Sequence, residues 1–242
     1  MNIGIVLAAF FVTIFLGIPI GVSVGLTSLT ASWANPSLPA TADFIFRNMV
    51  TALDTYALLA VPLFILSGVI MAQGGISKKL FDFFAYFVGN RTAGLPIAVI
   101  VTCLFYGAIS GSGPATVAAV GAMSIPLLVR LGYEREFVTA MVAVSGGLGV
   151  IIPPSIPFIM YGLSSGESVG KLFIAGILPG ILIGLFLMIY AYGYCRIKGE
   201  DKEKLKANYE SIRKQGFFRT FRDSFWALLT PVIILGGIYG GI

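Results

Sequence analysis

The chain has 242 residues, of which 57% are hydrophobic and 11% are charged, whereas a soluble domain carries roughly 25% charged residues. Charged residues are missing from six stretches, which are residues 1–42, 55–77, 92–129, 137–166, 172–195 and 224–242. Each reaches about the 18–20 residues that a helix needs to cross a bilayer. A soluble core cannot bury six such stretches, so the composition predicts an all-α polytopic membrane protein.

The net charge of +5 does not indicate a nucleic-acid-binding protein. Nine of the sixteen Lys and Arg residues lie in residues 196–222, between two apolar stretches and among four acidic residues. Short cytoplasmic loops carry such basic clusters, so residues 198–222 are predicted to form a cytoplasmic linker. The chain has two cysteines, no CxxC motif and no histidine, which excludes a disulfide framework and a Cys/His zinc site.

The first elements in chain order are two spans, expected at residues 2–33 and 54–74. Gly17, Gly21 and Gly25 lie one turn apart in the first span, a spacing that lets another helix approach closely. The N-terminus has no basic segment, which argues against a cleaved signal peptide. A polar loop is expected at residues 35–48. Residues 76–90 mix charged and aromatic side chains, which favours an interfacial amphipathic helix, with a short crossing as the alternative.

The uncharged residues 92–129 are interrupted at their centre by the sequence GAISGSGPAT. Pro114 cannot continue a preceding helix, but it suits the first turn of a new one behind a Ser or Gly N-cap. We therefore expect a hairpin over residues 94–130, with arms at 95–109 and 114–129. Arms of about 15 residues are shorter than the roughly 20 that a span requires, which favours a re-entrant hairpin. The alternative is two full spans joined at the membrane surface.

A second interruption lies within residues 136–163, where VSGGLGVIIPPSIP contains three glycines and three prolines. A helix cannot contain Pro153 and Pro154 without losing backbone hydrogen bonds, and such unpaired groups are costly in hydrocarbon. We expect a broken transmembrane helix with Ser155 capping its second half. The alternative is a kinked span whose gaps are filled by neighbouring helices.

The remaining apolar stretches predict a span at residues 170–196 and the start of another at 223–242. The first has a second glycine face, formed by Gly176, Gly180 and Gly184. No span carries an acid or a cation near its centre, so proton relay by such a group is unsupported.

The two interruptions offer neutral oxygen ligands. These are the unwound carbonyls and the hydroxyls of Ser110, Ser112, Thr116, Ser145 and Ser155. Hard cations prefer oxygen ligands, and half-helix N-termini attract anions, so the pattern suggests a sodium site coupled to an organic anion. Gly162, Ser164 and Gly166 match a nucleophile-elbow pattern, but the chain has no histidine base and no Gly-Lys-Ser/Thr phosphate loop. An enzyme is not expected.

Five segments closely resemble the large membrane subunit of TRAP (tripartite ATP-independent periplasmic) transporters. They are SGSGPATVAAVG at 110–121, GGLGVIIPPS at 146–155, KLFIAGILPG at 171–180, LAVPLFILSG at 59–68 and FWALLTP at 225–231. The resemblance covers essentially the whole chain. It implies sodium-coupled uptake of carboxylates, such as C4-dicarboxylates or sialic acid, across the bacterial inner membrane by an elevator-type movement. It also implies two protein partners, a small membrane subunit and a periplasmic binding protein, and no cofactor besides the coupling sodium ion.

Carried onto this chain, the resemblance implies that residues 110–114 and 145–155 form one sodium site and half of the substrate site. We expect both segments to be non-helical and close together at membrane mid-depth. The expected sodium ligands are Ser110, Gly111, Ser112, Ser145, Gly147 and Pro153. The expected substrate contacts are Ser112, Gly113, Thr116, Pro154 and Ser155.

The family's large subunit contains two inverted repeats, each with one hairpin and one broken helix. This chain is expected to hold the first repeat (1–197), the linker (198–222) and the first helix of a truncated second repeat (223–242), without the second half of the site. An inverted repeat needs an odd number of crossings before the linker, and residues 76–90 decide that count. The alternative function is a non-transporting assembly or anchor subunit whose glycine faces only pack helices.

Overall fold

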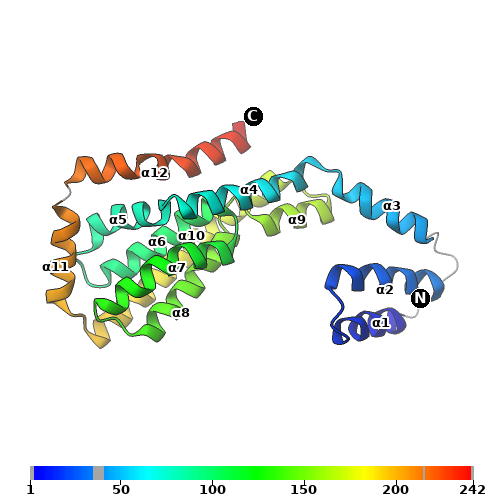
Figure 1. Ribbon diagram of the computed structural model, residues 1–242, viewed down its shortest axis with the longest axis horizontal. Helices are drawn as coiled ribbons and strands as arrows, with labels where there is room; N and C mark the ends of the chain where they lie inside the picture. Colours follow the sequence, from blue (N-terminus) through cyan, green and yellow to red (C-terminus); the bar gives the residue numbers. More distant parts are fainter. Residues whose placement is uncertain (1–2, 35–40, 215, 241–242) are drawn as a thin grey trace. The chain divides into compact units, whose positions relative to one another are not determined.

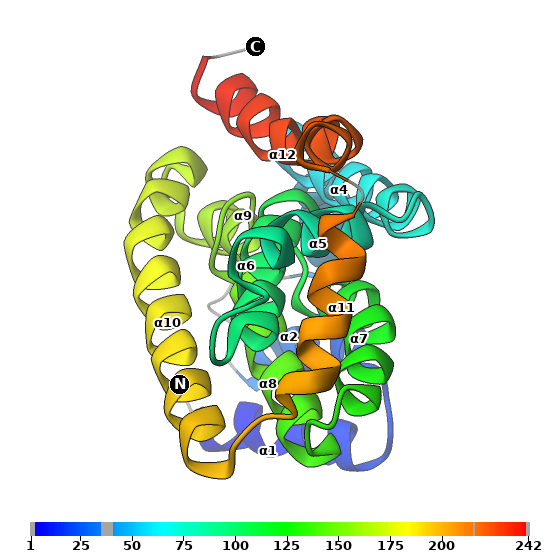
Figure 2. The same cartoon turned by 90° about the vertical axis from the view of Figure 1, so that its left-hand side faces the viewer.

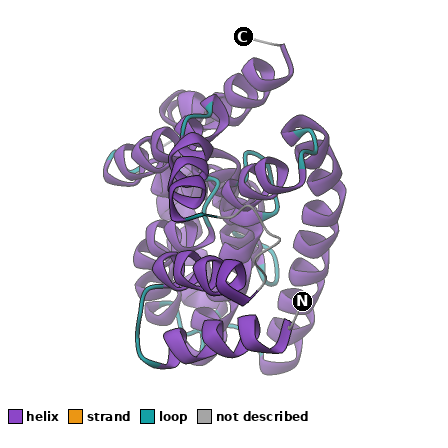
Figure 3. Ribbon diagram, turned by 90° about the vertical axis from the view of Figure 1, so that its right-hand side faces the viewer, coloured by secondary structure: helices purple, strands orange, loops and turns teal. Residues whose placement is uncertain are grey.

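The computed structural model describes residues 3–34, 41–214 and 216–240, and all regular structure in these ranges is helical (Figures 1 and 3). The elements are α1 (Ile3–Phe15), α2 (Ile20–Ala34), α3 (Ala42–Leu53), α4 (Tyr56–Gln73), α5 (Ile76–Val88), α6 (Gly94–Ser110), α7 (Gly113–Arg130), α8 (Arg135–Gly146), the 3₁₀ helix η1 (Gly147–Val150), α9 (Ile156–Ser165), α10 (Val169–Lys198), α11 (Lys202–Arg213) and α12 (Phe217–Gly240). The chain divides into two compact units, residues 1–58 and 59–242. The all-helical prediction is confirmed for the described residues.

The first unit contains α1 and α2, which pack against each other, and α3. The segment expected as one span, residues 2–33, is not one continuous helix, because α1 ends at Phe15 and α2 begins at Ile20. Pro19 has no N–H to donate to the preceding turn, and Gly17 has a φ of +78°. A Cβ added to Gly17 or Gly21 would meet no heavy atom within 4 Å. Neither glycine therefore serves as a helix-packing surface in the structure described.

The polar loop expected at residues 35–48 is wrong for residues 42–48, which are helical. Residues 35–40 lie outside the described part of the chain, and α3 already begins at Ala42. Thr41 caps this helix by accepting a hydrogen bond from the Phe44 N–H at 3.3 Å. An N-cap threonine followed by an acidic residue in the first turn, Asp43, is a helix-start pattern, which explains why the helix begins inside the stretch expected as a loop.

Several helices of the second unit have the length and composition of membrane spans. Among the described residues these are α7, α10 and α12, and the pair α4–α5 adds a fourth if that pair, bent by 65°, counts as one span. The outer side of α10 is apolar, with Leu178, Phe186 and Ile189 exposed by 67%, 68% and 65%. Apolar surface of this kind suits contact with lipid. The structure therefore fits a polytopic membrane protein.

The second unit is organised around α6, which packs against α5, α7, α8, α10 and α12 (Figures 1 and 2). Thirteen of its 17 residues are buried. The Tyr106 hydroxyl is buried there and donates a hydrogen bond to the Gly68 carbonyl of α4 at 2.9 Å. This places α6 at the centre of the core and α4 beside its C-terminal half.

The helices α6 and α7 form the expected hairpin, but its arms are longer than about 15 residues. They contain 17 and 18 residues, and α7 alone is long enough to cross a bilayer. Arm length therefore does not favour the re-entrant arrangement. Each arm gains one residue at the tip, Ser110 or Gly113, where a two-residue turn lets the helices run up to it, and one residue at the base, Gly94 or Arg130.

The linker helix α11 lies across the end of the helical bundle (Figures 1 and 2), with Leu205 and Ile212 buried. The next helix, α12, begins at Phe217 rather than at residue 223. Its early start follows from packing against α5: the Ser224 hydroxyl donates to the Lys79 carbonyl at 2.8 Å, and the ring of Phe217 lies 6.0 Å from that of Tyr86.

Candidate functional site

The hairpin tip consists of two residues, Gly111 and Ser112. α6 ends at Ser110, and Gly111 has a φ of +63°, a conformation that glycine adopts without steric cost. Ser112 caps α7, since its Oγ accepts a hydrogen bond from the Ala115 N–H at 3.4 Å, and Pro114 lies in the first turn. The tip thus ends one helix and starts the next without a longer loop.

The buried hydroxyls of the tip bond to one another. Ser110 Oγ lies 3.1 Å from Thr116 Oγ1, and Thr116 Oγ1 donates to the Ser112 carbonyl at 2.8 Å. Ser110 and Thr116 are 1% and 0% exposed. These hydroxyls therefore hold the shape of the turn, and any ligand would share oxygens that already have a protein partner.

The second interruption separates α8 from α9. α8 ends at Gly146, η1 follows, and α9 starts at Ile156 after a non-helical segment that contains the cis Pro153–Pro154 bond. Ser155 Oγ donates to the Val150 carbonyl at 2.6 Å and accepts from the Phe158 N–H at 3.3 Å. Ser155 thus caps α9 and also links the two ends of the non-helical segment, from Val150 to Ser155.

Both half-helices at this place begin in the same way. Ser112 and Ser155 have nearly equal backbone angles (φ −134°, ψ 122° and φ −125°, ψ 120°), and each is followed two residues later by a proline, Pro114 or Pro157. Both α7 and α9 therefore begin at the junction, each with an N-terminus that carries partial positive charge.

The tip and the interruption are in direct main-chain contact. The Ile156 N–H donates to the Gly111 carbonyl at 3.2 Å. A Cβ added to Gly107 would lie 2.5 Å from Gly149 Cα, and one added to Gly149 would lie 2.5 Å from Thr116 Oγ1 and 3.0 Å from the Ser112 carbonyl oxygen. The two backbones could not approach this closely if either glycine carried a side chain. We call this contact region the tip–break junction.

The helix α10 lies against the same junction. A Cβ on Gly176 would be 2.6 Å from the Ile151 carbonyl oxygen, and one on Gly180 would be 2.3 Å from Ile152 Cδ1. Farther along, a Cβ on Gly184 would lie 3.0 Å from Leu104 Cδ1 of α6. The second glycine face thus packs within this chain, where it supports the non-helical segment and α6.

The structure brings together the two segments that contain all the predicted ligands. Ser110, Gly111, Ser112, Gly113 and Thr116 lie on the hairpin tip, and Ser145, Gly147, Pro153, Pro154 and Ser155 lie at the interruption. The expectation that both segments are wholly non-helical is wrong. Only Gly111, Ser112 and residues 147–155 lie outside α-helix, because the caps let the flanking helices extend to the junction.

Ser145 differs from the other hydroxyl-bearing residues of the junction. Its side chain is 0% exposed, and its Oγ has no hydrogen-bond partner among the described residues. An unsatisfied buried hydroxyl costs about 1–3 kcal/mol. Such a group in the last turn of α8, next to the non-helical carbonyls, is available to a bound ligand.

The expected ligand set includes neither Gly107 nor Gly149, whose backbones approach each other so closely that a Cβ on Gly107 would lie 2.5 Å from Gly149 Cα. The spacing Gly107-x-x-x-Gly111 is the small-residue pattern that permits close helix approach, and it could have identified Gly107. No comparable pattern points to Gly149, since its partner is known only from the fold.

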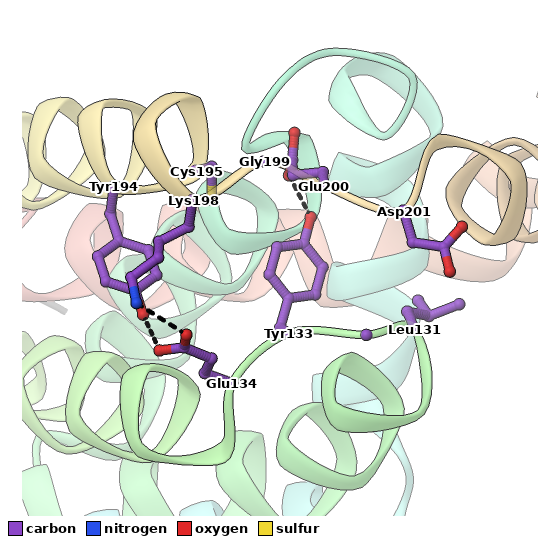
Figure 4. A pocket seen from close by; sticks show the side chains of 10 residues that line it. Leu131, Tyr133, Glu134, Tyr194, Cys195, Lys198, Gly199, Glu200 and Asp201 are labelled. Atoms are coloured by element: carbon purple, nitrogen blue, oxygen red, sulfur yellow. Dashed lines mark hydrogen bonds and ion pairs between the residues drawn. The ribbon is translucent and has the colours of Figure 1, made fainter.

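A second polar cluster lies where the hairpin helices and α10 meet the linker (Figure 4). The Glu200 carboxylate accepts the Tyr133 hydroxyl at 2.5 Å and the Ala93 N–H at 3.1 Å to each oxygen. Glu134 accepts the Tyr194 hydroxyl and pairs with Lys198 at 3.0 Å. Because this cluster joins the start of α6, the α7–α8 connection and the end of α10, we call it the hairpin base.

Two pKa shifts follow from these contacts. Burial, followed by the hydrogen bond to Glu200, raises the pKa of Tyr133 above its usual range. The hydrogen bond from Tyr194, together with Lys198, lowers the pKa of Glu134. From the sequence, Glu200 is one of the interspersed linker acids and Glu134 has no assigned role, because their partners lie 60 to 107 positions away in the chain.

Comparison with known proteins gives consistent matches. A family model described as "Tripartite ATP-independent periplasmic transporter, DctM component" matches residues 7–242. The isethionate TRAP transporter permease protein DctMQ of Oleidesulfovibrio alaskensis is 43% identical over 96% of this chain and 36% of its own length. The C4-dicarboxylate large permease protein DctM of Pseudomonas aeruginosa is 45% identical over 78% of this chain and 43% of its own length.

A third relative has a different named substrate. The sialic acid TRAP transporter permease protein SiaT of Haemophilus influenzae is 34% identical over 100% of this chain and 38% of its own length. The chain thus spans less than half the length of these three relatives.

Proposed function

The chain belongs to the DctM family of TRAP transporter large permeases, and from this we propose that it forms part of a sodium-coupled permease for small organic acids in the bacterial inner membrane. The named substrates of its relatives, isethionate, C4-dicarboxylate and sialic acid, support an acidic substrate. The proposed partners are a small membrane subunit and a periplasmic binding protein. The proposed movement is that of an elevator-type carrier built from inverted repeats, of which this chain contributes one.

The observation that carries the proposal is the unpartnered Ser145 hydroxyl at the tip–break junction. Sodium prefers neutral and anionic oxygen ligands, and the junction offers hydroxyls and non-helical carbonyls with no charged side chain in residues 107–117 or 145–158. We assign the ion to Ser145 together with Ser110, Gly111, Ser112, Gly147 and Pro153. Because Ser145 Oγ has no hydrogen-bond partner in the described part of the chain, an ion would supply the contact that this hydroxyl lacks.

The substrate would bind beside the ion, at the start of the two half-helices. Ser112, Gly113 and Thr116 belong to the first turn of α7 and its cap, whereas Pro154 and Ser155 precede α9. Helix N-termini favour anions, so a carboxylate is stabilised where both helices begin. A second hairpin and broken helix would supply the other half of this site.

The proposed cytoplasmic position of the linker also gives an orientation for the hairpin. The basic linker that follows α10 is proposed to be cytoplasmic, and its Glu200 contacts the start of α6 and the α7–α8 connection. The hairpin base and the linker therefore share one side of the membrane. The tip then points from the cytoplasmic surface toward the membrane interior.

Replacement of Ser145 by alanine tests the sodium site in the assembled transporter. Loss of one ligand should raise the sodium concentration for half-maximal uptake by about fivefold, the equivalent of about 1 kcal/mol. Uptake is measured with a panel of labelled organic acids over a sodium titration. The matched control is Ser124→Ala, because Ser124 Oγ is also buried without a partner but lies in α7, away from the tip.

Three results are informative. A larger sodium requirement in the Ser145 variant alone supports the site. Equal sodium dependence in both variants and in the unmodified protein removes Ser145 from it. Absence of sodium-dependent uptake of any acid in the assembled, unmodified transporter would favour the assembly or anchor role instead.

A further inference from the structure

Glu200 makes an unusual set of contacts for a residue of a charged surface linker. Its two carboxylate oxygens accept the Ala93 N–H at 3.1 Å each, and Oε1 also accepts the Tyr133 hydroxyl at 2.5 Å. Ala93 is fully buried and has a φ of +57° just before α6. Amides at the start of a helix have no acceptor within the helix, so the carboxylate satisfies a donor that would otherwise be unpaired.

Glu134, which follows Tyr133 in the chain, connects the hairpin directly to α10. Tyr133 donates to Glu200 of the linker, while Glu134 accepts from Tyr194 and pairs with Lys198 in the last turns of α10. The start of α6 and the end of α7 are therefore both tied to the segment in which α10 ends. These contacts join the two arms of the hairpin to one common support.

That support also reaches the tip–break junction. α10 carries Tyr194 and Lys198 at the hairpin base and, earlier in the same helix, Gly176 and Gly180 against the non-helical segment. The hairpin arms cover about 26 Å between base and tip, at 1.5 Å per residue. α10 thus contacts the hairpin directly at its base and contacts the tip–break junction through Ile151 and Ile152 of the broken helix. A shift of the hairpin relative to α10 at the base would therefore also move the tip relative to the segment that α10 holds.

We propose that Glu200 is a positioning residue: by tying Ala93 and Tyr133 to the end of α10, it keeps the hairpin tip in register with the broken helix. The inference deepens the proposed function, because it names a residue outside the ion site on which the geometry of that site depends. Glu200 touches neither ion nor substrate. Its effect is transmitted through the rigid arms α6 and α7.

Hydrogen exchange tests this inference without reference to transport. The variants are Glu200→Gln, which keeps the size and removes the charge, and Tyr133→Phe, which removes one donor. In the assembled transporter in lipid nanodiscs, Glu200→Gln should accelerate exchange of the Ala93 amide by about tenfold, as for loss of a charged hydrogen bond. The decisive amides lie at the tip and break, residues 111–116 and 155–159, where we expect acceleration of about threefold.

The matched control is Glu203→Gln, which neutralises an exposed carboxylate in the first turn of α11 that makes no hydrogen bond or ion pair with any described residue. It should leave exchange at the tip unchanged. Faster exchange confined to residues 93–97 in the Glu200 and Tyr133 variants would overturn the proposal, since the contact would then be local. Unchanged exchange at Ala93 would overturn the contact itself.

Sodium-dependent uptake provides the second measurement. A looser register lowers the fraction of binding-competent sites, which raises the apparent sodium requirement while the maximal rate per folded transporter is kept. We expect the half-saturating sodium concentration of Glu200→Gln to rise about threefold. A lower maximal rate with unchanged half-saturation indicates a merely structural role and overturns the proposal. If the unmodified transporter shows no sodium dependence, the proposed function fails, and the exchange experiment still decides the role of Glu200.

Discussion

The two ends of the α6–α7 hairpin are held by opposite kinds of contact. At the tip, main chains touch through Gly107, Gly111 and Gly149, and the polar groups are neutral hydroxyls and carbonyls. At the base, two carboxylates receive hydrogen bonds from tyrosines, a lysine and a backbone amide. Uncompensated charge is costly in a low-dielectric interior, whereas at the water-exposed end it costs little.

This difference predicts how each end responds to change. The tip depends on close packing, so added atoms should destabilise it. It has no charged side chain that a substitution could remove. The base depends on hydrogen bonds and charge, so its variants should respond to pH and salt. The following predictions test that distinction.

The largest effect is expected from an added methyl group at the tip–break junction. Gly149→Ala places a Cβ 2.5 Å from Thr116 Oγ1 and 3.0 Å from the Ser112 carbonyl oxygen. Such overpacking costs about 1–3 kcal/mol, so the melting temperature of the purified transporter should fall and sodium binding should weaken. The matched control for the melting temperature is Gly147→Ala in the same segment, where a Cβ meets no atom within 4 Å. Because Gly147 is itself assigned to the ion, sodium binding is compared with the unmodified transporter. Equal melting temperatures would show that the junction is not closely packed.

An intermediate effect is expected at the base when Tyr133 loses its proton. The pKa of Tyr133 is raised in the folded protein, so its contribution to stability is complete below its ordinary pKa of about 10 and is lost as the pH rises further. The melting temperature should therefore decline above this pH, and the decline should be smaller in Tyr133→Phe. The measurement is a series of thermal unfolding curves at increasing pH. Parallel curves for both proteins would contradict the role given to the Tyr133–Glu200 contact.

The smallest effect is expected from the ion pair between Lys198 and Glu134. Its side chains are 55% and 50% exposed, and exposed pairs contribute little and are screened by salt. Because the pKa of Glu134 is lowered, any stabilisation is present above its ordinary pKa and is lost as the pH falls below it. A double-mutant cycle of Lys198→Gln and Glu134→Gln at low and high salt measures the pair. A large coupling that persists at high salt would contradict this view of the base.

The sequence predicts the tip more successfully than the base, and the reason is physical. Proline and serine act on the helix in which they occur, so Ser112 with Pro114 and Ser155 with Pro157 mark helix starts without knowledge of the fold. Glu200 acts on residues 67 and 107 positions away, and no local pattern distinguishes it from a solvated linker acid.

The first unit shows the limit of reading apolar length alone. Residues 2–33 are continuously uncharged, and the prediction of one span rests on this length alone, without the helix-breaking signal of Pro19. The hairpin arms are also longer than predicted, by one residue at the tip, where Gly111 and Ser112 alone form the turn, and by one residue at the base. The positions of helix-breaking proline and glycine residues therefore predict the helix ends better here than the length of an apolar run does.

The helices α7 and α9 begin with the same Ser-x-Pro pattern, but their first-turn amides are not equally occupied by hydrogen bonds. In α9 the Ile156 N–H bonds to Gly111, Pro157 has none, and the Phe158 N–H bonds to the Ser155 hydroxyl. In α7, Pro114 likewise has no N–H, and the Ala115 N–H bonds to the Ser112 hydroxyl. The Gly113 N–H, however, has no acceptor among the described residues. Although both helix dipoles favour an anion, only α7 has a first-turn amide free to donate to it. If a carboxylate binds between the two helices as proposed, Gly113 is the only one of these amides that would orient it, so two similar helix starts would give the bound anion a defined direction.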